Sequence, residues 1–134
     1  MGERKLKIAI TGSEGLLGKE ITNYLSKNHK VFKLDLELGH NLSDEKFVKN
    51  WFKKNKPEFL IICAAKVGGI LKNKNYPLEF LLDNFLIEKN LLMAAKKYNI
   101  KRTIFLGSSC IYPRKSKTPI KESYLMSGKL EKTN

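Results

Sequence analysis

Residues 6–18 read LKIAITGSEGLLG, an apolar run that leads directly into three glycines spaced three residues apart. The run indicates a buried strand, and helical periodicity follows over residues 16–27. Gly12 permits a tight turn off the strand, Gly15 lets backbone N–H groups approach a phosphate, and Gly18 allows the helix to pack closely on the strand. A plain strand–helix turn is the alternative, but this context favours a dinucleotide-binding segment.

The rest of the chain continues the alternation of strands and helices. Apolar runs and helical patterns follow one another at residues 30–35, 44–56, 59–63, 77–98 and 102–106. Strands that are apolar throughout indicate a parallel sheet covered on both faces. We therefore predict an α/β fold with a Rossmann-type doubly wound parallel sheet, present in part and with strand order 3-2-1-4. Residues 1–134 are expected to form this one NAD(P)-binding domain, and Ser43 is expected to cap its second helix.

The composition bears on the partners of the chain. The formal net charge is +13, from 26 Lys and Arg against 13 Asp and Glu. Only three of the 26 are Arg, the side chain suited to bidentate phosphate and base contacts, so solvated lysine-rich faces are favoured over nucleic-acid binding. No apolar run approaches the ~20 residues of a membrane span, so a cytoplasmic protein without a membrane partner is expected. Cys63 and Cys110 lack the spacing of metal ligands, which predicts no metal site.

Asp35 ends the second predicted strand, about twenty residues after the glycines. A carboxylate at this place can bind the adenosine ribose hydroxyls, and it favours NAD because it repels a 2′-phosphate. After the third strand, the small Ala64 and Ala65 would let a cofactor pass close to the backbone. The sequence thus predicts a cofactor site at the carboxyl ends of the strands.

Two further strings carry a resemblance to a known family. Residues 64–70 read AAKVGGI and residues 105–113 read FLGSSCIYP. With the glycine segment, they resemble the GDP-L-fucose synthase family in the extended branch of the short-chain dehydrogenases/reductases. The resemblance runs from Lys7 to Asn134. It implies an NADP-dependent enzyme that converts GDP-4-keto-6-deoxy-D-mannose to GDP-L-fucose by 3,5-epimerisation and reduction at C4, with NAD kept open by Asp35.

The resemblance also implies roles for individual residues. Ser108 would hydrogen-bond the sugar ketone, and Cys110 would move protons at the carbons beside it. A small buried packing residue is the alternative for Cys110. The remaining residues implied to bind the cofactor are Gly12, Ser13, Glu14, Gly15, Leu16, Leu17, Gly18, Asp35, Asn41, Ala64, Ala65, Leu106, Gly107 and Ser109. Those implied to bind the substrate are Val67, Gly68 and Gly69, for which an ordinary glycine turn is the alternative.

The family's Tyr-x-x-x-Lys segment and its sugar-binding region have no counterpart in the chain. We therefore expect the N-terminal fragment of a homodimeric enzyme, inactive by itself, with a GDP-sugar as its ligand. Two alternatives remain open. The chain could derive from another nucleotide-sugar epimerase or dehydratase, which would usually lack Cys110 and the VGGI string. It could also be a dinucleotide-binding module without catalysis.

Overall fold

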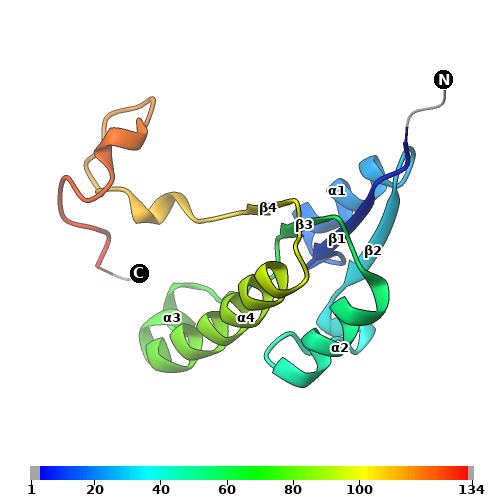
Figure 1. The fold of residues 1–134 in the computed structure, drawn as a ribbon. Coiled ribbons are helices and arrows are strands. Elements are labelled where there is room, and N and C mark those ends of the chain that lie inside the picture. Colours follow the sequence, from blue (N-terminus) through cyan, green and yellow to red (C-terminus); the bar gives the residue numbers. More distant parts are fainter. Residues whose placement is uncertain (1–3, 133–134) are drawn as a thin grey trace. The chain divides into compact units, whose positions relative to one another are not determined.

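The computed structural model describes residues 4–132, which divide into two compact units (Figure 1). The first unit comprises residues 4–67 and 78–106, and the second comprises residues 68–77 and 107–132. The sheet and its covering helices belong to the first unit.

The sheet has four parallel strands, and it confirms the predicted α/β fold of Rossmann type. In chain order the strands are β1 (Lys7–Thr11), β2 (Lys30–Leu34), β3 (Phe59–Ile62) and β4 (Arg102–Phe105). Thr11 at the end of β1 is in register with Leu34 of β2 and with Ile62 of β3. The carboxyl ends of these three strands therefore lie side by side, at one edge of the sheet.

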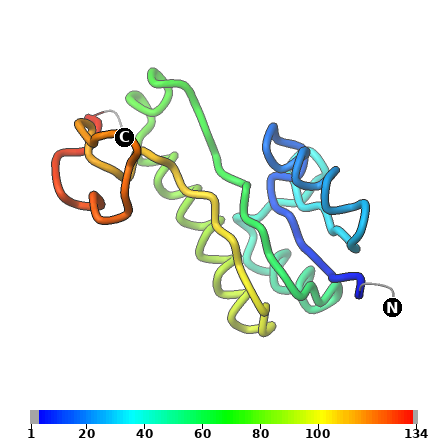
Figure 2. Tube along the Cα trace, turned by 90° about the horizontal axis from the view of Figure 1, so that it is seen from above, coloured from blue at the N-terminus to red at the C-terminus, as the bar shows by residue number. Residues whose placement is uncertain are grey.

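The predicted strand order 3-2-1-4 is wrong, because the observed order is β2-β1-β3-β4. Helix α1 (Leu16–Leu25) contacts β1 and β2 on one face of the sheet, whereas α2 (Glu45–Asn55) and α4 (Pro77–Lys97) cover the other face (Figures 1 and 2). Crossovers between parallel strands are right-handed, so helices on opposite faces carry the chain in opposite directions along the sheet. The chain therefore reverses after β2, passes β1, and continues in one direction through β3 to β4.

The main core lies between the sheet and the α2–α4 face. Ala9, Leu60 and Ile62 from the strands pack there with Phe52 and Leu91 from the two helices, and all five are buried. Ile8 and Ile10 are also buried but belong to the opposite face, as expected from the alternation of side chains along a strand. Both faces of β1 are therefore covered, which explains why its sequence is apolar without alternation.

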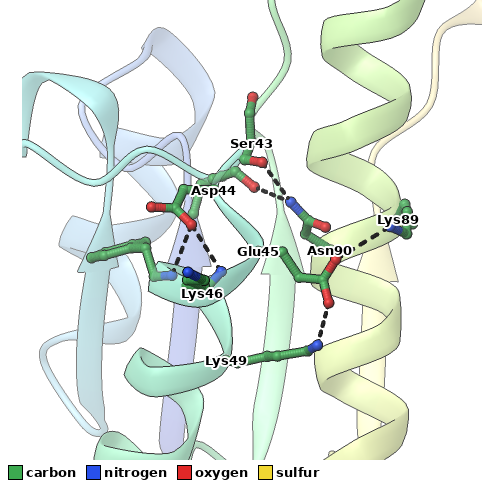
Figure 3. Close-up of polar contacts among 9 residues, drawn as sticks. Ser43, Asp44, Glu45, Lys46, Lys49, Lys89 and Asn90 are labelled. Carbon is green, nitrogen blue, oxygen red and sulfur yellow. Dashed lines mark hydrogen bonds and ion pairs between the residues drawn. The ribbon is translucent and has the colours of Figure 1, made fainter.

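The first turn of α2 is capped by Asp44 rather than by Ser43 (Figure 3). The Asp44 carboxylate accepts hydrogen bonds from the backbone N–H groups of Lys46, at 2.8 Å, and Phe47, at 3.2 Å. Both residues can cap a helix, and the helix begins one residue later than the sequence pattern predicted.

Asn90 of α4 forms hydrogen bonds with the segment that leads into α2. Its side chain is buried and donates from Nδ2 to the carbonyl oxygens of Leu42, at 3.0 Å, and Ser43, at 2.9 Å (Figure 3). Glu45 adds a second link, because it pairs with Lys49 in its own helix and with Lys89 of α4. The segment between β2 and α2 is thus held from the α4 side.

The second unit contains only short elements. They are α3 (Ile70–Asn75), η2 (Ser109–Ile111) and η3 (Glu122–Tyr124), whereas the short η1 (Leu36–Leu38) belongs to the first unit. Helix α3 lies between residues 63 and 77, where the sequence pattern predicted neither a strand nor a helix. Within residues 107–132, the Arg114 N–H donates to the carbonyl oxygen of Lys129, and Arg114 Nε pairs with Glu131 at 3.3 Å.

Candidate functional site

The first unit contains a cleft of about 760 Å³ at the carboxyl edge of the sheet. In an open parallel sheet this edge is where ligands bind, close to the strand at which the chain reverses direction. The cleft is bounded by the segments that follow β1, β2, β3 and β4 and by one face of α4. The predicted site residues that line it are Gly12, Gly15, Leu16, Leu17, Gly18, Asp35, Asn41, Ala64, Ala65, Val67 and Leu106.

Two of the three glycines are required by the backbone geometry. Gly12 has a φ of +67°, and a Cβ there would lie 2.8 Å from the backbone nitrogen of Ala64. A Cβ on Gly18 would overlap the carbonyl group of Gly12. The turn off β1 can therefore pass close to β3 on one side and to α1 on the other only if both residues lack a side chain.

The amino terminus of α1 opens onto this cleft without a side-chain cap. Gly15 is the N-cap residue, makes no side-chain hydrogen bond, and is followed by a first turn without an acidic residue. The first backbone N–H groups of a helix have no partner inside the helix, and the helix dipole makes this end electropositive. The arrangement can therefore bind an anion such as a diphosphate.

Asp35 connects the end of β2 to the glycine segment. Its Oδ2 accepts from the backbone N–H of Glu14 at 2.9 Å, and its Oδ1 accepts from the N–H of Glu37 at 3.0 Å. Glu14 in turn pairs with Lys33 at 3.0 Å. The Asp35 carboxylate lines the cleft in a fixed orientation, and each oxygen keeps a lone pair for another donor.

The segment after β3 is fixed from two directions. The backbone N–H of Ala64 donates to Thr11 Oγ1 at 3.3 Å, and the backbone of Lys66 exchanges two hydrogen bonds with the Asn84 side chain of α4. The Lys66 side chain also pairs with Asp83. Residues 64–67 are therefore held in place by these contacts along one wall of the cleft.

Cys63 contributes a thiol to the same wall. It is half-buried, lines the cleft, and has its pKa raised by burial, which disfavours the thiolate. Cys63 is thus a poor nucleophile near neutral pH.

Some predicted residues lie outside the cleft lining. Ser13 is a fully buried residue of the glycine segment. Glu14, in the same segment, contacts the cleft residue Asp35 through a hydrogen bond from its backbone N–H. The others belong to the second unit, namely Gly68, Gly69, Gly107, Ser108, Ser109 and Cys110.

The second unit places Ser108 beside Cys110. Ser108 Oγ accepts from the backbone N–H of Cys110 at 3.1 Å, at the start of η2. Cys110 is exposed, so the alternative of a small buried packing residue is wrong. Both of these predicted site residues are on one short turn, and the hydroxyl of Ser108 keeps its proton available for donation.

The cleft also has lining residues that the sequence analysis did not assign to the site. They are Leu36, Glu37, His40, Leu42, Ser43, Cys63, Lys66, Asp83 and Ile87. Asp83 and Ile87 are four residues apart on α4, a spacing that places both on one face of a helix. This spacing is the one signal in the sequence that could have found them.

Among residues 4–132, no group of three or more His, Cys, Asp or Glu side chains is placed to hold a metal ion. Within the same range, every helix is too short or too polar to cross a membrane.

The sequence and the fold are similar to those of known enzymes. GDP-L-fucose synthase 1 of Arabidopsis thaliana is 39% identical over all of this chain, which spans 42% of that protein. GDP-L-fucose synthase of Escherichia coli strain K12 is 38% identical over 97% of this chain and 41% of its own length. A GDP-L-fucose synthetase from Naegleria fowleri, solved bound to NADP, superposes with a TM-score of 0.81 at 34% identity, over 95% of this chain and 41% of that one.

The chain therefore spans about two fifths of the length of these relatives. Residues 8–134 match the NAD dependent epimerase/dehydratase family, which is nearly the whole sequence. With the Rossmann-type sheet and the glycine segment at its carboxyl edge, this match shows that the chain belongs to the NAD dependent epimerase/dehydratase family.

Proposed function

We propose that the cleft of the first unit binds a nicotinamide adenine dinucleotide, with its diphosphate at the amino terminus of α1. The observation that carries this proposal is the uncapped helix end, which opens onto the cleft behind Gly12 and Gly15. Asp35 would accept hydrogen bonds from the adenosine ribose, and Asn41 would hydrogen-bond the adenine. The bound NADP of the Naegleria fowleri protein supports NADP as the form used in the family.

We further propose that this segment serves a nucleotide-sugar epimerase/reductase that makes GDP-L-fucose. The named relatives support this activity, and Val67 with Gly68 and Gly69 would contact the GDP-sugar. When bound, the reduced nicotinamide supplies a hydride for C4 of the sugar. A homodimeric full-length enzyme stays a prediction from the resemblance.

Ser108 and Cys110 would perform different steps of this reaction. Hydride addition places negative charge on the ketone oxygen, which the Ser108 hydroxyl would stabilise by donating a hydrogen bond. The carbonyl acidifies C3 and C5, so the Cys110 thiolate would accept a proton from one face of such a carbon, and inversion would then require a different donor to deliver a proton to the opposite face. The exposure of Cys110 supports this role, because a proton-transfer group must reach its substrate.

A chimera tests the proposed activity. Residues 1–134 would replace the matching segment of the Escherichia coli GDP-L-fucose synthase, and the keto sugar would be supplied with reduced cofactor in D₂O. We expect deuterium at C3 and C5 together with cofactor oxidation. The Cys110→Ser variant should still bind cofactor but lose the deuterium incorporation. A chimera that binds the dinucleotide yet neither exchanges nor reduces the sugar would contradict the proposed activity.

A further inference from the structure

The second unit has a pocket of its own, with a volume of about 700 Å³. Its lining comes from two segments, within residues 113–117 and 127–132, and from Tyr124. The two segments are joined where the backbone N–H of Arg114 donates to the carbonyl oxygen of Lys129 at 3.0 Å. The volume is in the range of small-molecule sites, which is about 300–1,000 Å³. Among the described residues, this pocket and the cleft of the first unit have no lining residue in common.

The charges that line this pocket have one sign. Five of its eleven lining residues are basic, and none carries a carboxylate. The basic residues are Arg114, Lys115, Lys117, Lys129 and Lys132. Arg114 is paired with Glu131 at 3.3 Å, whereas the four lysines have no carboxylate partner within residues 4–132. A concave surface lined by one sign of charge concentrates ions of the opposite sign, so the pocket is suited to an anion.

The uncharged part of the lining indicates an organic anion. Pro113 and Leu130 contribute apolar surface, and Tyr124 contributes a planar aromatic ring. The methylene stems of the lysines add to this apolar surface. Inorganic phosphate would contact the cations but would leave most of the volume unfilled. A planar or apolar group attached to the anion would fill it.

Ser116 adds a hydroxyl that lacks a partner. It lines the pocket, and its Oγ is buried without a hydrogen-bond partner among the described residues. Buried polar groups in folded proteins are nearly always paired. A rotamer change about one torsion would turn this hydroxyl toward a phosphate oxygen in the pocket, which would accept its proton.

We propose that this pocket binds a nucleoside diphosphate. The lysines would hold the diphosphate as point charges, which requires no bidentate geometry. The low number of Arg residues, which disfavours nucleic-acid recognition, is therefore compatible with this ligand. The base would stack on the ring of Tyr124, and the ribose would lie against the apolar lining. The pocket is separate from the proposed dinucleotide cleft, so it would be a second ligand site of the chain.

The test is titration calorimetry of the purified chain with GDP, at low salt and in excess NADH. We expect saturable one-to-one binding that weakens as salt is added. GMP should bind at least about fivefold more weakly, because it carries less negative charge.

Two double variants compare the pocket with another basic surface. Lys117→Gln with Lys129→Gln removes two exposed charges of the pocket and should weaken GDP binding by about tenfold or more. Lys53→Gln with Lys54→Gln removes the same charge from exposed positions of α2, outside the cleft and the pocket, and should bind GDP like the parent chain. Both variants should fold, because substitutions of exposed lysines have small effects on stability.

The outcomes separate this proposal from the proposed cofactor cleft. A folded chain that binds no GDP, or equal GDP affinities of the two double variants, would overturn the second site. Inorganic pyrophosphate that binds as tightly as GDP would also overturn it, because the nucleoside would then contribute nothing. Binding of GDP only in the absence of NADH would place it in the cleft of the first unit and overturn the second site. GDP bound through Lys117 and Lys129 without any binding of NADH would support the second site and overturn only the cofactor cleft.

Discussion

Gly18 of α1 packs so tightly against Gly12 that a Cβ at residue 18 would lie 2.7 Å from the Gly12 carbonyl carbon. The contact fixes the distance between α1 and the turn after β1. It therefore also determines where the amino terminus of α1 opens onto the cleft.

Replacing Gly18 by alanine should destabilise the first unit. The added methyl group has only backbone atoms around it, so the helix must move, at a cost of about 1–3 kcal/mol in the free energy of unfolding. Urea denaturation followed by circular dichroism would measure this loss. Gly69→Ala is the matched control, because nothing lies within 4 Å of a Cβ there. Equal stability of the two variants would contradict the packing argument.

Asn90→Leu should also destabilise the protein, by a different mechanism. The buried side chain satisfies the carbonyl groups of Leu42 and Ser43, and each one left without a donor costs about 1–3 kcal/mol. Thermal and urea unfolding would report the loss, with exposed Asn50→Ala of α2 expected within about 0.5 kcal/mol of the parent chain. A neutral Asn90→Leu would mean that the two hydrogen bonds contribute nothing.

The stability of the chain should fall in acid, in part because of Glu58. The hydrogen bond from Lys101, the backbone N–H of Lys7 and the charge of Arg4 lower the pKa of Glu58 below its ordinary value of 4.5. A carboxyl whose pKa is lower in the folded state stabilises the protein above its unfolded pKa, and this contribution is lost as the pH falls through the folded pKa.

Thermal melting between pH 6 and pH 3 would measure this effect. Glu58→Gln should show a shallower decline of the melting temperature below about pH 5 than the parent chain. Because these ion pairs are exposed, the difference should be small and should diminish in high salt. A parallel decline in both proteins at low salt would show that Glu58 does not contribute.

The two thiols should react at different rates. Burial raises the pKa of Cys63 and shields it, whereas Cys110 is exposed. Near pH 7.5, iodoacetamide should therefore modify Cys110 faster, as followed by mass spectrometry of the two peptides. A dinucleotide bound in the cleft should slow only the modification of Cys63, which lines it. Equal protection of both thiols, or of neither, would contradict the assignment of the cleft.

The sequence predicted the four strands and the helices α1, α2 and α4 to within a few residues, because apolar periodicity and glycine positions report local structure directly. It did not predict the strand order. Strands such as β1 and β3 are apolar on both faces. Their sequences therefore do not indicate on which face the connecting helix packs, or in which direction along the sheet the chain moves to the next strand. Ser43 and Asp44 are both good caps, so the start of α2 was also misjudged by one residue.

The sequence likewise singled out some of the residues that line the cleft and missed others. The glycine segment, Asp35 and the two alanines were found because each has a fixed place relative to a strand end. His40 and Asp83 were missed because their place in the cleft depends on a loop conformation and on the packing of α4. No local pattern marks His40, and the spacing of Asp83 and Ile87 indicates a shared helix face without telling that this face borders the cleft.

The most direct measurement is calorimetric titration of the chain and of its Gly15→Asp variant with NADH. Aspartate is a favourable N-cap residue, and its Cβ would lie 3.3 Å from the Gly12 carbonyl oxygen, a contact that a small shift relieves, so the variant should still fold. Its carboxylate would occupy the helix end that we assign to the diphosphate, so binding should be lost. Asn28→Asp adds the same charge at an exposed position outside the cleft and should bind NADH normally. Saturable one-to-one binding that only Gly15→Asp abolishes is the predicted result. Undiminished binding by Gly15→Asp, or none by the folded parent chain, would contradict the assignment of the cleft.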